Sequence, residues 1–157
     1  EKHNTSTIIP SLGVPMGSEE IWCAIRQKDL EGNVAGKNIS VPVYFVEHEH
    51  HFFRYGYYGD GSQAYPDNAS RFGFFSKAVL QICRSLDWEP DIFHSNDWYT
   101  ALIPFYLKQA QLETNDFKNS RSVLTIHNAG YQGGAPGTFR HSLSIPLENF
   151  VLEMFEG

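Results

Sequence analysis

The sequence predicts an α/β fold in which helices flank a parallel sheet, with a β-hairpin preceding this unit. Three observations lead to this expectation. Apolar residues recur at helical spacing after Asp67. Two short runs at 91–94 and 122–127 have the composition of β-strands, and a second helical segment lies between them. Strands and helices alternating through short junctions are typical of a parallel βαβ unit.

Composition limits the kind of protein this is. The 157 residues are 41% hydrophobic and 15% aromatic, which indicates one folded domain rather than a disordered chain. The net charge of −6 and the lack of a basic cluster argue against a nucleic-acid partner. No apolar run reaches the roughly 20 residues of a membrane span, and the first residues do not resemble a signal peptide. Cys23 and Cys83 lie in apolar runs and are expected to be buried free thiols.

The first elements are expected to be strands. Residues 21–25 and 41–46 are rich in apolar and β-branched side chains, so they predict a hairpin, with turn residues at 31–33 and 36–38. Pro42 places the second strand at a sheet edge or at a strand start. A long aromatic loop follows over 48–66. Four of its aromatic residues are expected mostly to pack the loop against the body: Phe52, Phe53, Tyr55 and Tyr57.

Two helices are expected next. Asp67 should cap the first helix, which Pro90 closes, and one apolar stripe should comprise Phe72, Phe75, Val79, Ile82, Cys83 and Leu86. The second should run from about 98 to 109, with Pro104 kinking it or ending its first segment. Its buried side should comprise Trp98, Ala101, Leu102 and Phe105. Residues 147–155 could form a short helix.

Polar residues end both predicted parallel strands. In such sheets, ligands bind outside the carboxyl ends of the strands, so Asp97, His127 and Asn128 are expected on one rim. Each residue alone has a structural explanation. Asp97 could be a helix N-cap, and His94 and His127 could be core histidines bonded to backbone carbonyls. Found together at two strand ends, they favour a functional site.

Four ordered runs resemble motifs of bacterial glycogen synthases and plant starch synthases. They are FRYGYYG at 53–59, YPDNASRF at 65–72, DIFHSNDWYTALIP at 91–104 and VLTIHNAGYQG at 123–133. Tyr99 departs from the His or Gln common in the family, and residues after Pro136 are only faintly similar. The resemblance implies a GT-B fold with two Rossmann-like domains. It identifies residues 1–157 as part of the N-terminal domain, without the family's glycine-rich start and C-terminal nucleotide-binding domain.

The resemblance also implies an activity. The family transfers glucose, with retention, from ADP-glucose or UDP-glucose to the non-reducing end of an α-1,4-glucan, and no metal or cofactor is required. Asp97 and His127 would be catalytic, and the substrate-binding residues would be Asn128, Tyr58, Asn96 and Trp98. The location would be the bacterial cytoplasm, or the plastid in a plant. The chain alone would be inactive.

Other interpretations stay open at this point. The chain could be a non-catalytic α-glucan-binding module, or a packing domain whose polar strand ends only cap helices. His48, His50 and His51 invite a metal site, but their spacing fits no common one. Exposed edges of an incomplete parallel sheet would favour self-association.

Overall fold

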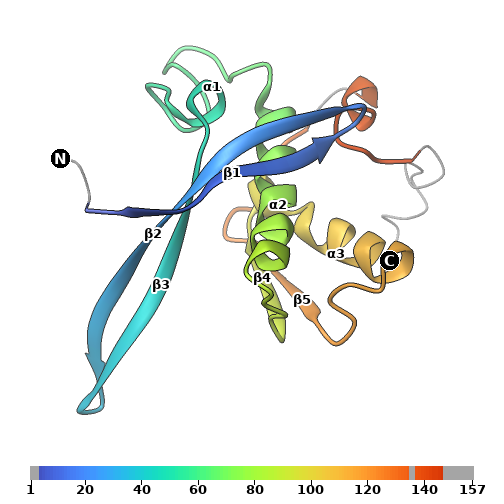
Figure 1. The fold of residues 1–157 in the computed structure, drawn as a ribbon. Coiled ribbons are helices and arrows are strands. Elements are labelled where there is room, and N and C mark those ends of the chain that lie inside the picture. Colours follow the sequence, from blue (N-terminus) through green and yellow to red (C-terminus); the bar gives the residue numbers. More distant parts are fainter. Residues whose placement is uncertain (1–3, 135–136, 147–157) are drawn as a thin grey trace.

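The computed structural model describes residues 4–134 and 137–146, and its centre is helix α2 (Asn68–Ser85). An antiparallel sheet lies on one side of α2, in the order β1 (Ser6–Met16), β2 (Glu19–Val34), β3 (Lys37–Glu47). On the other side lie helix α3 (Ile103–Glu113) and the parallel pair β4 (Ile92–Asn96) and β5 (Arg121–Thr125) (Figure 1). Short helical turns are α1 (Glu49–Phe52), η1 (Trp98–Thr100) and η2 (Gly137–Arg140). The predicted α/β class with a parallel sheet is confirmed.

The predicted hairpin is confirmed, but it is longer than expected and a strand, β1, precedes it. Residues 31–33 belong to β2, so the turn predicted there is wrong. The chain reverses at Ala35 and Gly36, between the paired residues Val34 and Lys37, and both turn residues have positive φ, 50° and 80°. Tight hairpins favour such a turn because its twist matches that of the strands. Pro42 lies in edge strand β3, where its missing N–H costs no ladder bond.

The far half of the hairpin is an arm. β1 follows β2 only as far as the pair Ser6–Gln27. Beyond it, β2 and β3 continue as a two-stranded ribbon that leaves the body (Figure 1). Every residue from 29 to 42 in this arm is exposed.

Helix α2 is buried on two sides, so the expectation of one apolar stripe is wrong. Phe74, Ala78 and Ile82 pack against β1 and β2. Leu80 and Cys83 pack against Phe93 and the buried side of α3. The predicted Phe72 and Phe75 are only half-buried. A helix between two layers needs apolar residues all round, which blurs the helical period. Cys23 and Cys83 are buried and free as predicted, and burial raises the pKa of each to about 11.

The single helix predicted over 98–109 is wrong, because two separate elements occupy this segment. Residues 98–100 form the separate turn η1, and α3 begins at Ile103, with Pro104 in its first turn. Proline suits that position because the first helical N–H groups have no partner within the helix. The buried side shifts accordingly and comprises Ile103, Tyr106, Leu107 and Ala110. The predicted Trp98, Ala101, Leu102 and Phe105 are half-buried. The helix suggested for 147–155 lies outside the described residues.

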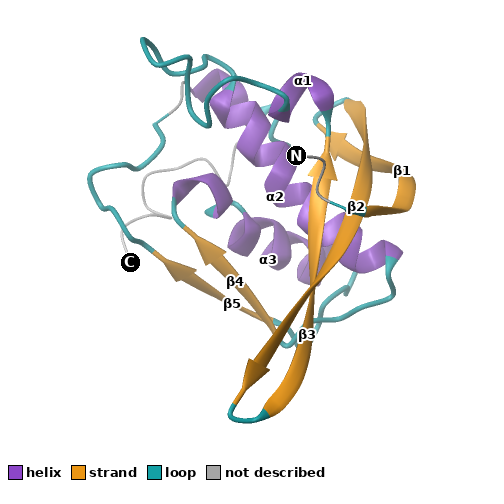
Figure 2. Cartoon of the chain, turned by 90° about the vertical axis from the view of Figure 1, so that its left-hand side faces the viewer, coloured by secondary structure: helices purple, strands orange, loops and turns teal. Residues whose placement is uncertain are grey.

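One face of the parallel pair is uncovered. Figure 2 shows β4 and β5 side by side, with β5 outermost. Within the described residues β5 pairs only with β4, and the exposed apolar residues on this face are Ile92 and Val123. Leu124 lies on the opposite face, which also carries the buried Phe93 and Ser95, but it is exposed because β5 is at the edge of the pair. None of the helices in the described ranges is both long and apolar enough to cross a bilayer.

Candidate active site

The carboxyl ends of β4 and β5 bring Asp97 and His127 together. The two strands are paired in parallel through Asn96 and Thr125, and the Asp97 backbone N–H extends the ladder by donating to the Thr125 carbonyl at 2.8 Å. Because parallel strands end at the same edge, residues just past each end become neighbours. The rim predicted from the sequence therefore exists, and these two residues are in direct contact.

The Asp97 carboxylate accepts hydrogen bonds from both the backbone N–H and the imidazole of His127. The His127 backbone N–H lies 2.7 Å from Oδ1, and imidazole Nδ1 lies 3.0 Å from Oδ2. The backbone bond first, and then the imidazole, hold the pKa of Asp97 below its ordinary value. An ionised carboxylate can only accept, so we assign the proton to Nδ1. This leaves Nε2 of His127 available, on a side chain that is 61% exposed while Asp97 is 17% exposed.

The N-cap interpretation of Asp97 is wrong. Asp97 precedes η1, but its side chain makes no capping hydrogen bond. Its backbone has φ 59° and ψ −177°, a region that glycine favours. Backbone strain of this kind concentrates at functional sites, where the surroundings hold a side chain in an otherwise unfavourable position.

Four aromatic rings form a cluster beside Asp97, which we call the aromatic wall: Tyr58, Phe72, Trp98 and Tyr99. The Tyr58 ring lies 5.9 Å from both Trp98 and Tyr99, and Phe72 meets Trp98 edge-on at 4.9 Å. The predicted residues Tyr58 and Trp98 thus lie together at the rim. Glycine at 133 lets the loop after β5 approach the wall, because a Cβ there would collide with Trp98.

Tyr99 is the site residue that the sequence analysis did not select. Its hydroxyl donates to Asp97 Oδ2 at 3.3 Å, a long hydrogen bond. Partial burial, beside the Tyr58 phenol and the Asp97 carboxylate, raises the pKa of Tyr99 to about 12, so it stays a donor at neutral pH. The sequence offered one indication that Tyr99 belongs to the site, because it lies only two residues after Asp97. The turn η1 brings its side chain back toward the Asp97 carboxylate.

The remaining predicted residues lie at the same rim but make no described contact with Asp97. Asn128 accepts a hydrogen bond from the Gly130 N–H at 3.0 Å, which shapes the loop after His127. Asn96 is exposed at the end of β4, and its backbone is held by the Thr100 hydroxyl. His94 is exposed, with Nε2 2.7 Å from the Thr125 hydroxyl, so it is no core histidine.

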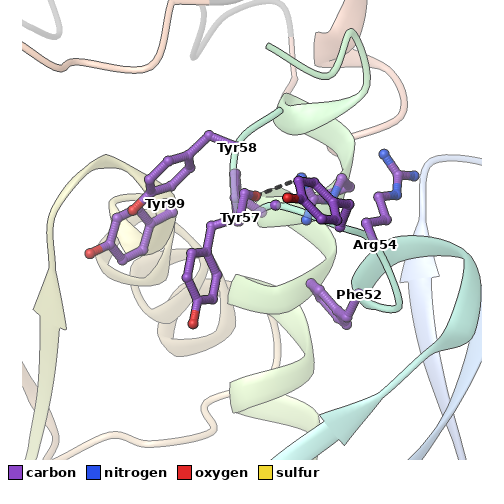
Figure 3. Close-up of a pocket in the computed structure, with 9 residues that line it drawn as sticks. Phe52, Arg54, Tyr57, Tyr58 and Tyr99 are labelled. Carbon is purple, nitrogen blue, oxygen red and sulfur yellow. Dashed lines mark hydrogen bonds between the residues drawn. The ribbon is translucent and has the colours of Figure 1, made fainter. Parts of the chain in front are cut away.

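A pocket of about 670 Å³ opens next to the aromatic wall, a size typical of small-molecule sites. It is lined by Phe52, Arg54, Tyr55, Gly56, Tyr57, Tyr58, Arg71, Phe72 and Tyr99. Figure 3 shows Tyr58 and Tyr99 together on one side and Phe52 and Arg54 on the other. The expectation that the loop aromatics mostly pack inward is wrong for Phe53, Tyr55 and Tyr57, which are 85%, 94% and 86% exposed.

Two arginines tether the aromatic loop to α2. Arg54 donates to both oxygens of Asp67, at 2.7 and 2.5 Å, and its guanidinium lies over the Tyr65 ring. Arg71 is 3% exposed and donates to the His51 carbonyl at 2.8 Å and the Tyr57 carbonyl at 3.1 Å. Asp67 therefore holds the loop through an ion pair, and the side-chain cap predicted for it is absent.

The histidine cluster has structural contacts. His48 Nδ1 accepts from the His51 N–H at 3.2 Å and so caps α1. His51 is buried, with its ring 5.0 Å from Phe74, and burial first, then the neighbouring His48 and His50, lower its pKa to about 4. Among the described residues no three side chains of the metal-binding types converge.

All of residues 1–157 match the family model described as the starch synthase catalytic domain. The chain is 40% identical over 148 residues to a glycogen synthase of Thermodesulfovibrio yellowstonii. This alignment covers 91% of the chain and 29% of that protein. It is 37% identical over 153 residues to a glycogen synthase of Koribacter versatilis, covering 98% of the chain and 30% of that protein.

A solved structure is similar as well. The catalytic domain of starch synthase IV from Arabidopsis thaliana, bound to ADP and acarbose, superposes with a TM-score of 0.72 at 25% identity. The match covers 93% of the chain and 27% of that domain. The chain thus spans less than a third of the length of these relatives.

Proposed function

The chain belongs to the starch synthase catalytic domain family, and from this membership we propose that it supplies the glucose-binding and acceptor-binding rim of a glucosyltransferase. The reaction is transfer of glucose, with retention, from ADP-glucose or UDP-glucose to the non-reducing end of an α-1,4-glucan. The location is the bacterial cytoplasm, or the plastid in a plant. The solved relative with ADP and acarbose supports a nucleotide and a glucan-like ligand as partners.

The Asp97–His127 pair is the single observation that carries this proposal. A glucosyl group that leaves its diphosphate develops positive charge at the ring, and an ionised carboxylate nearby stabilises that charge. The lowered pKa keeps Asp97 ionised at neutral pH. His127, with Nδ1 engaged by Asp97, presents Nε2 to a sugar hydroxyl and so fixes the orientation of the glucose.

The pocket beside the pair is proposed to hold the acceptor. Tyr57, Tyr58 and Tyr99 offer flat faces for sugar rings, and the hydroxyls of Tyr57 and Tyr58 can hydrogen-bond to the sugars. Asn96, Trp98 and Asn128 border the same rim and would contact the sugars there. In the complete enzyme, the glycine-rich start and the C-terminal nucleotide-binding domain of the family would bind the donor. The 157-residue chain alone is therefore expected to transfer no glucose.

The experiment measures incorporation of labelled glucose from each donor into glycogen by the complete enzyme. Tyr57→Ala should raise the KM for glycogen about fivefold to tenfold, because a stacking face is worth about 1 to 1.4 kcal/mol. Phe53→Ala is the matched control: Phe53 is equally exposed on the same loop but does not line the pocket. Equal effects of the two variants would remove the pocket from the proposal.

A glucan-binding module without catalysis is the alternative that this experiment separates. Such a module would bind maltoheptaose, with affinity lost in Tyr57→Ala, yet neither donor would support transfer. Incorporation of labelled glucose by the complete enzyme would exclude a glucan-binding module without catalysis. Incorporation by the 157-residue chain alone would contradict the proposed division of labour.

A further inference from the structure

Thr100, the last residue of η1, bonds back to the end of β4 through its side chain. Its hydroxyl accepts from the Asn96 N–H at 2.7 Å and donates to the Asn96 carbonyl at 2.6 Å. The next residue, Asp97, donates its N–H to β5, and neighbouring residues of a strand turn their backbone polar groups to opposite sides. The Asn96 N–H and carbonyl therefore point away from β5, and the hydroxyl of Thr100 satisfies both.

Thr100 also holds the two peptide groups that flank Asp97. In the peptide group before it, the Asn96 carbonyl accepts from the Thr100 hydroxyl, and the Asp97 N–H donates to the Thr125 carbonyl at 2.8 Å. In the peptide group after it, the Asp97 carbonyl accepts from the Thr100 N–H at 3.2 Å, and the Thr100 hydroxyl lies 3.4 Å from the same oxygen. Because peptide groups are planar, holding both of them fixes φ and ψ of the residue between them.

The conformation of Asp97 requires such a restraint. Its φ of 59° with ψ of −177° lies in a region that glycine adopts readily and that residues with a Cβ avoid. A relaxed Asp97 would return to negative φ. That rotation would turn the carboxylate away from the His127 N–H, which lies 2.7 Å from Oδ1.

We propose that the Thr100 hydroxyl is a positioning group for glucosyl transfer, which holds the Asp97 backbone in its strained conformation and so keeps the carboxylate oriented toward the substrate. The hydroxyl bonds only backbone atoms of the described residues, and Thr100 does not line the pocket, so it acts through Asp97. This inference rests on the proposed function, because it gives Thr100 a part in the work of Asp97.

The kinetics of three Thr100 variants of the complete enzyme test this role. Valine has the branched shape of threonine but cannot hydrogen-bond, so Thr100→Val leaves the Asn96 groups without a partner and without space for a water. It should lower kcat about 10- to 50-fold and keep KM for glycogen within about twofold, because a displaced catalytic group costs rate and not binding. Thr100→Ser restores the hydroxyl and should retain at least about half of the parental kcat. Thr100→Ala leaves space for a water and should fall between these two variants.

Thr114→Val is the matched control. The Thr114 hydroxyl donates to the carbonyl of Ala110, four residues earlier, at 3.0 Å, as Thr100 does to Asn96. It lies at the opposite end of α3 from η1, so kcat should stay within about twofold of the parental value. A fall in kcat as large as that of Thr100→Val would overturn the proposal, because loss of any such hydroxyl would then lower activity.

Combining Thr100→Val with Asp97→Asn tests the route of the effect. In the Asp97→Asn background, Thr100→Val should lower kcat less than about threefold, because the charge that it positions is already absent. Equal falls in both backgrounds would overturn the positioning role. So would a folded Thr100→Val enzyme with parental kcat, or a Thr100→Ser variant no better than Thr100→Val.

Melting temperatures of all variants show which of them fold. If Thr100→Val does not fold, Thr100→Ala enters the same comparisons, with an expected fall in kcat of at least about threefold. A parental kcat in a folded Thr100→Ala enzyme would then overturn the inference. Near-normal turnover of Asp97→Asn alone would reject the proposed function together with this inference. Lost turnover in Asp97→Asn with parental kcat in the Thr100 variants would reject this inference alone.

Discussion

Asp97 combines three features that distinguish it from a residue that only precedes a helical turn. Its backbone adopts a glycine-like conformation, its carboxylate accepts from the His127 N–H and imidazole, and the Tyr99 hydroxyl lies 3.3 Å away. These partners fix the carboxylate at the rim and keep it ionised. A residue that served only to start η1 would need none of them. The local physics therefore agrees with a carboxylate held ready for a developing positive charge.

Tyr99 is expected to position Asp97 through the hydroxyl alone. Tyr99→Phe keeps the ring in the aromatic wall and removes the donor to Asp97. In the complete enzyme it should lower kcat about threefold to tenfold with KM for glycogen unchanged, because the pocket wall remains. Tyr99→Ala, which also removes the ring, should raise KM as well. A Phe variant with a raised KM and an unchanged kcat would show that the hydroxyl binds substrate and does not orient Asp97.

His51 predicts a loss of stability in mild acid. Burial lowers its folded pKa to about 4, below the ordinary value of 6.5. The contribution of neutral His51 to the free energy of unfolding is fully present above pH 6.5 and is lost as the pH falls toward 4. In this range the proton binds to His51 in the unfolded chain but not in the folded protein. Between pH 8 and pH 5 this lowers the free energy of unfolding by about 2 kcal/mol.

Urea unfolding at the two pH values measures this effect. His51→Phe should remove most of the difference, since a phenyl ring can pack on Phe74 without titrating. The neighbouring His50 is exposed, so His50→Gln is the control and should keep the pH dependence. An unchanged pH dependence in His51→Phe would assign the acid sensitivity to other groups.

At the scale of elements, the aromatic loop depends on contacts distant in sequence. Arg54 reaches Asp67 and Arg71 reaches the carbonyls of His51 and Tyr57, so one turn of α2 holds the whole loop in place. The run YPDNASRF at 65–72 now has a physical explanation. Tyr65 lies under Arg54, Asn68 donates to the Tyr58 carbonyl at 2.8 Å, and Phe72 joins the aromatic wall.

Removing the Arg71 tether should cost both stability and acceptor binding. Arg71→Met leaves the buried His51 carbonyl and the part-buried Tyr57 carbonyl without their donor, and it should lower the free energy of unfolding by about 3 kcal/mol. Arg84→Met on the same helix is the control. Arg84 pairs with Asp116 near the surface and should cost less than about 1 kcal/mol. Chemical denaturation of both variants, with glycogen KM measured beside it, separates a structural tether from a dispensable surface charge.

The β2–β3 turn should improve on substitution. Ala35 has φ 50°, which costs an ordinary residue about 1 kcal/mol, whereas asparagine tolerates positive φ and suits the first position of this turn. Ala35→Asn should therefore raise the free energy of unfolding by up to about 1 kcal/mol. Gly36→Ala, with φ 80° at the replaced glycine, should lower it. Equal effects of the two changes would contradict the turn geometry.

Local patterns in the sequence predict most of the helices and strands. They predict the breaks between these elements and their tertiary contacts less well. The two parallel strands and their polar ends were predictable, because parallel strands must end at one rim. β1 was missed because Pro10 and Pro15 interrupt the alternation, which an edge strand tolerates. The break at η1 and the partner of Asp67 were missed because each depends on contacts that no local period encodes.

At the scale of the whole molecule, one face of β4 and β5 is uncovered within the described residues, and the chain spans less than a third of the length of its relatives. We propose that, in the complete enzyme, further parts of the catalytic domain cover this face and the rim. Water is then excluded from the Asp97–His127 pair, which strengthens the electrostatic effect of the carboxylate on the transferring glucose.

The most direct test of the central claim is the turnover of Asp97→Asn in the complete enzyme. Asparagine keeps the size and can still accept from the His127 N–H, so the melting temperature should change little. Loss of the charge should lower kcat by about 10²–10³, with KM much less affected, because the charge matters most at the transition state. Near-normal turnover in a folded Asp97→Asn enzyme would contradict the assignment of glucosyl transfer to this rim.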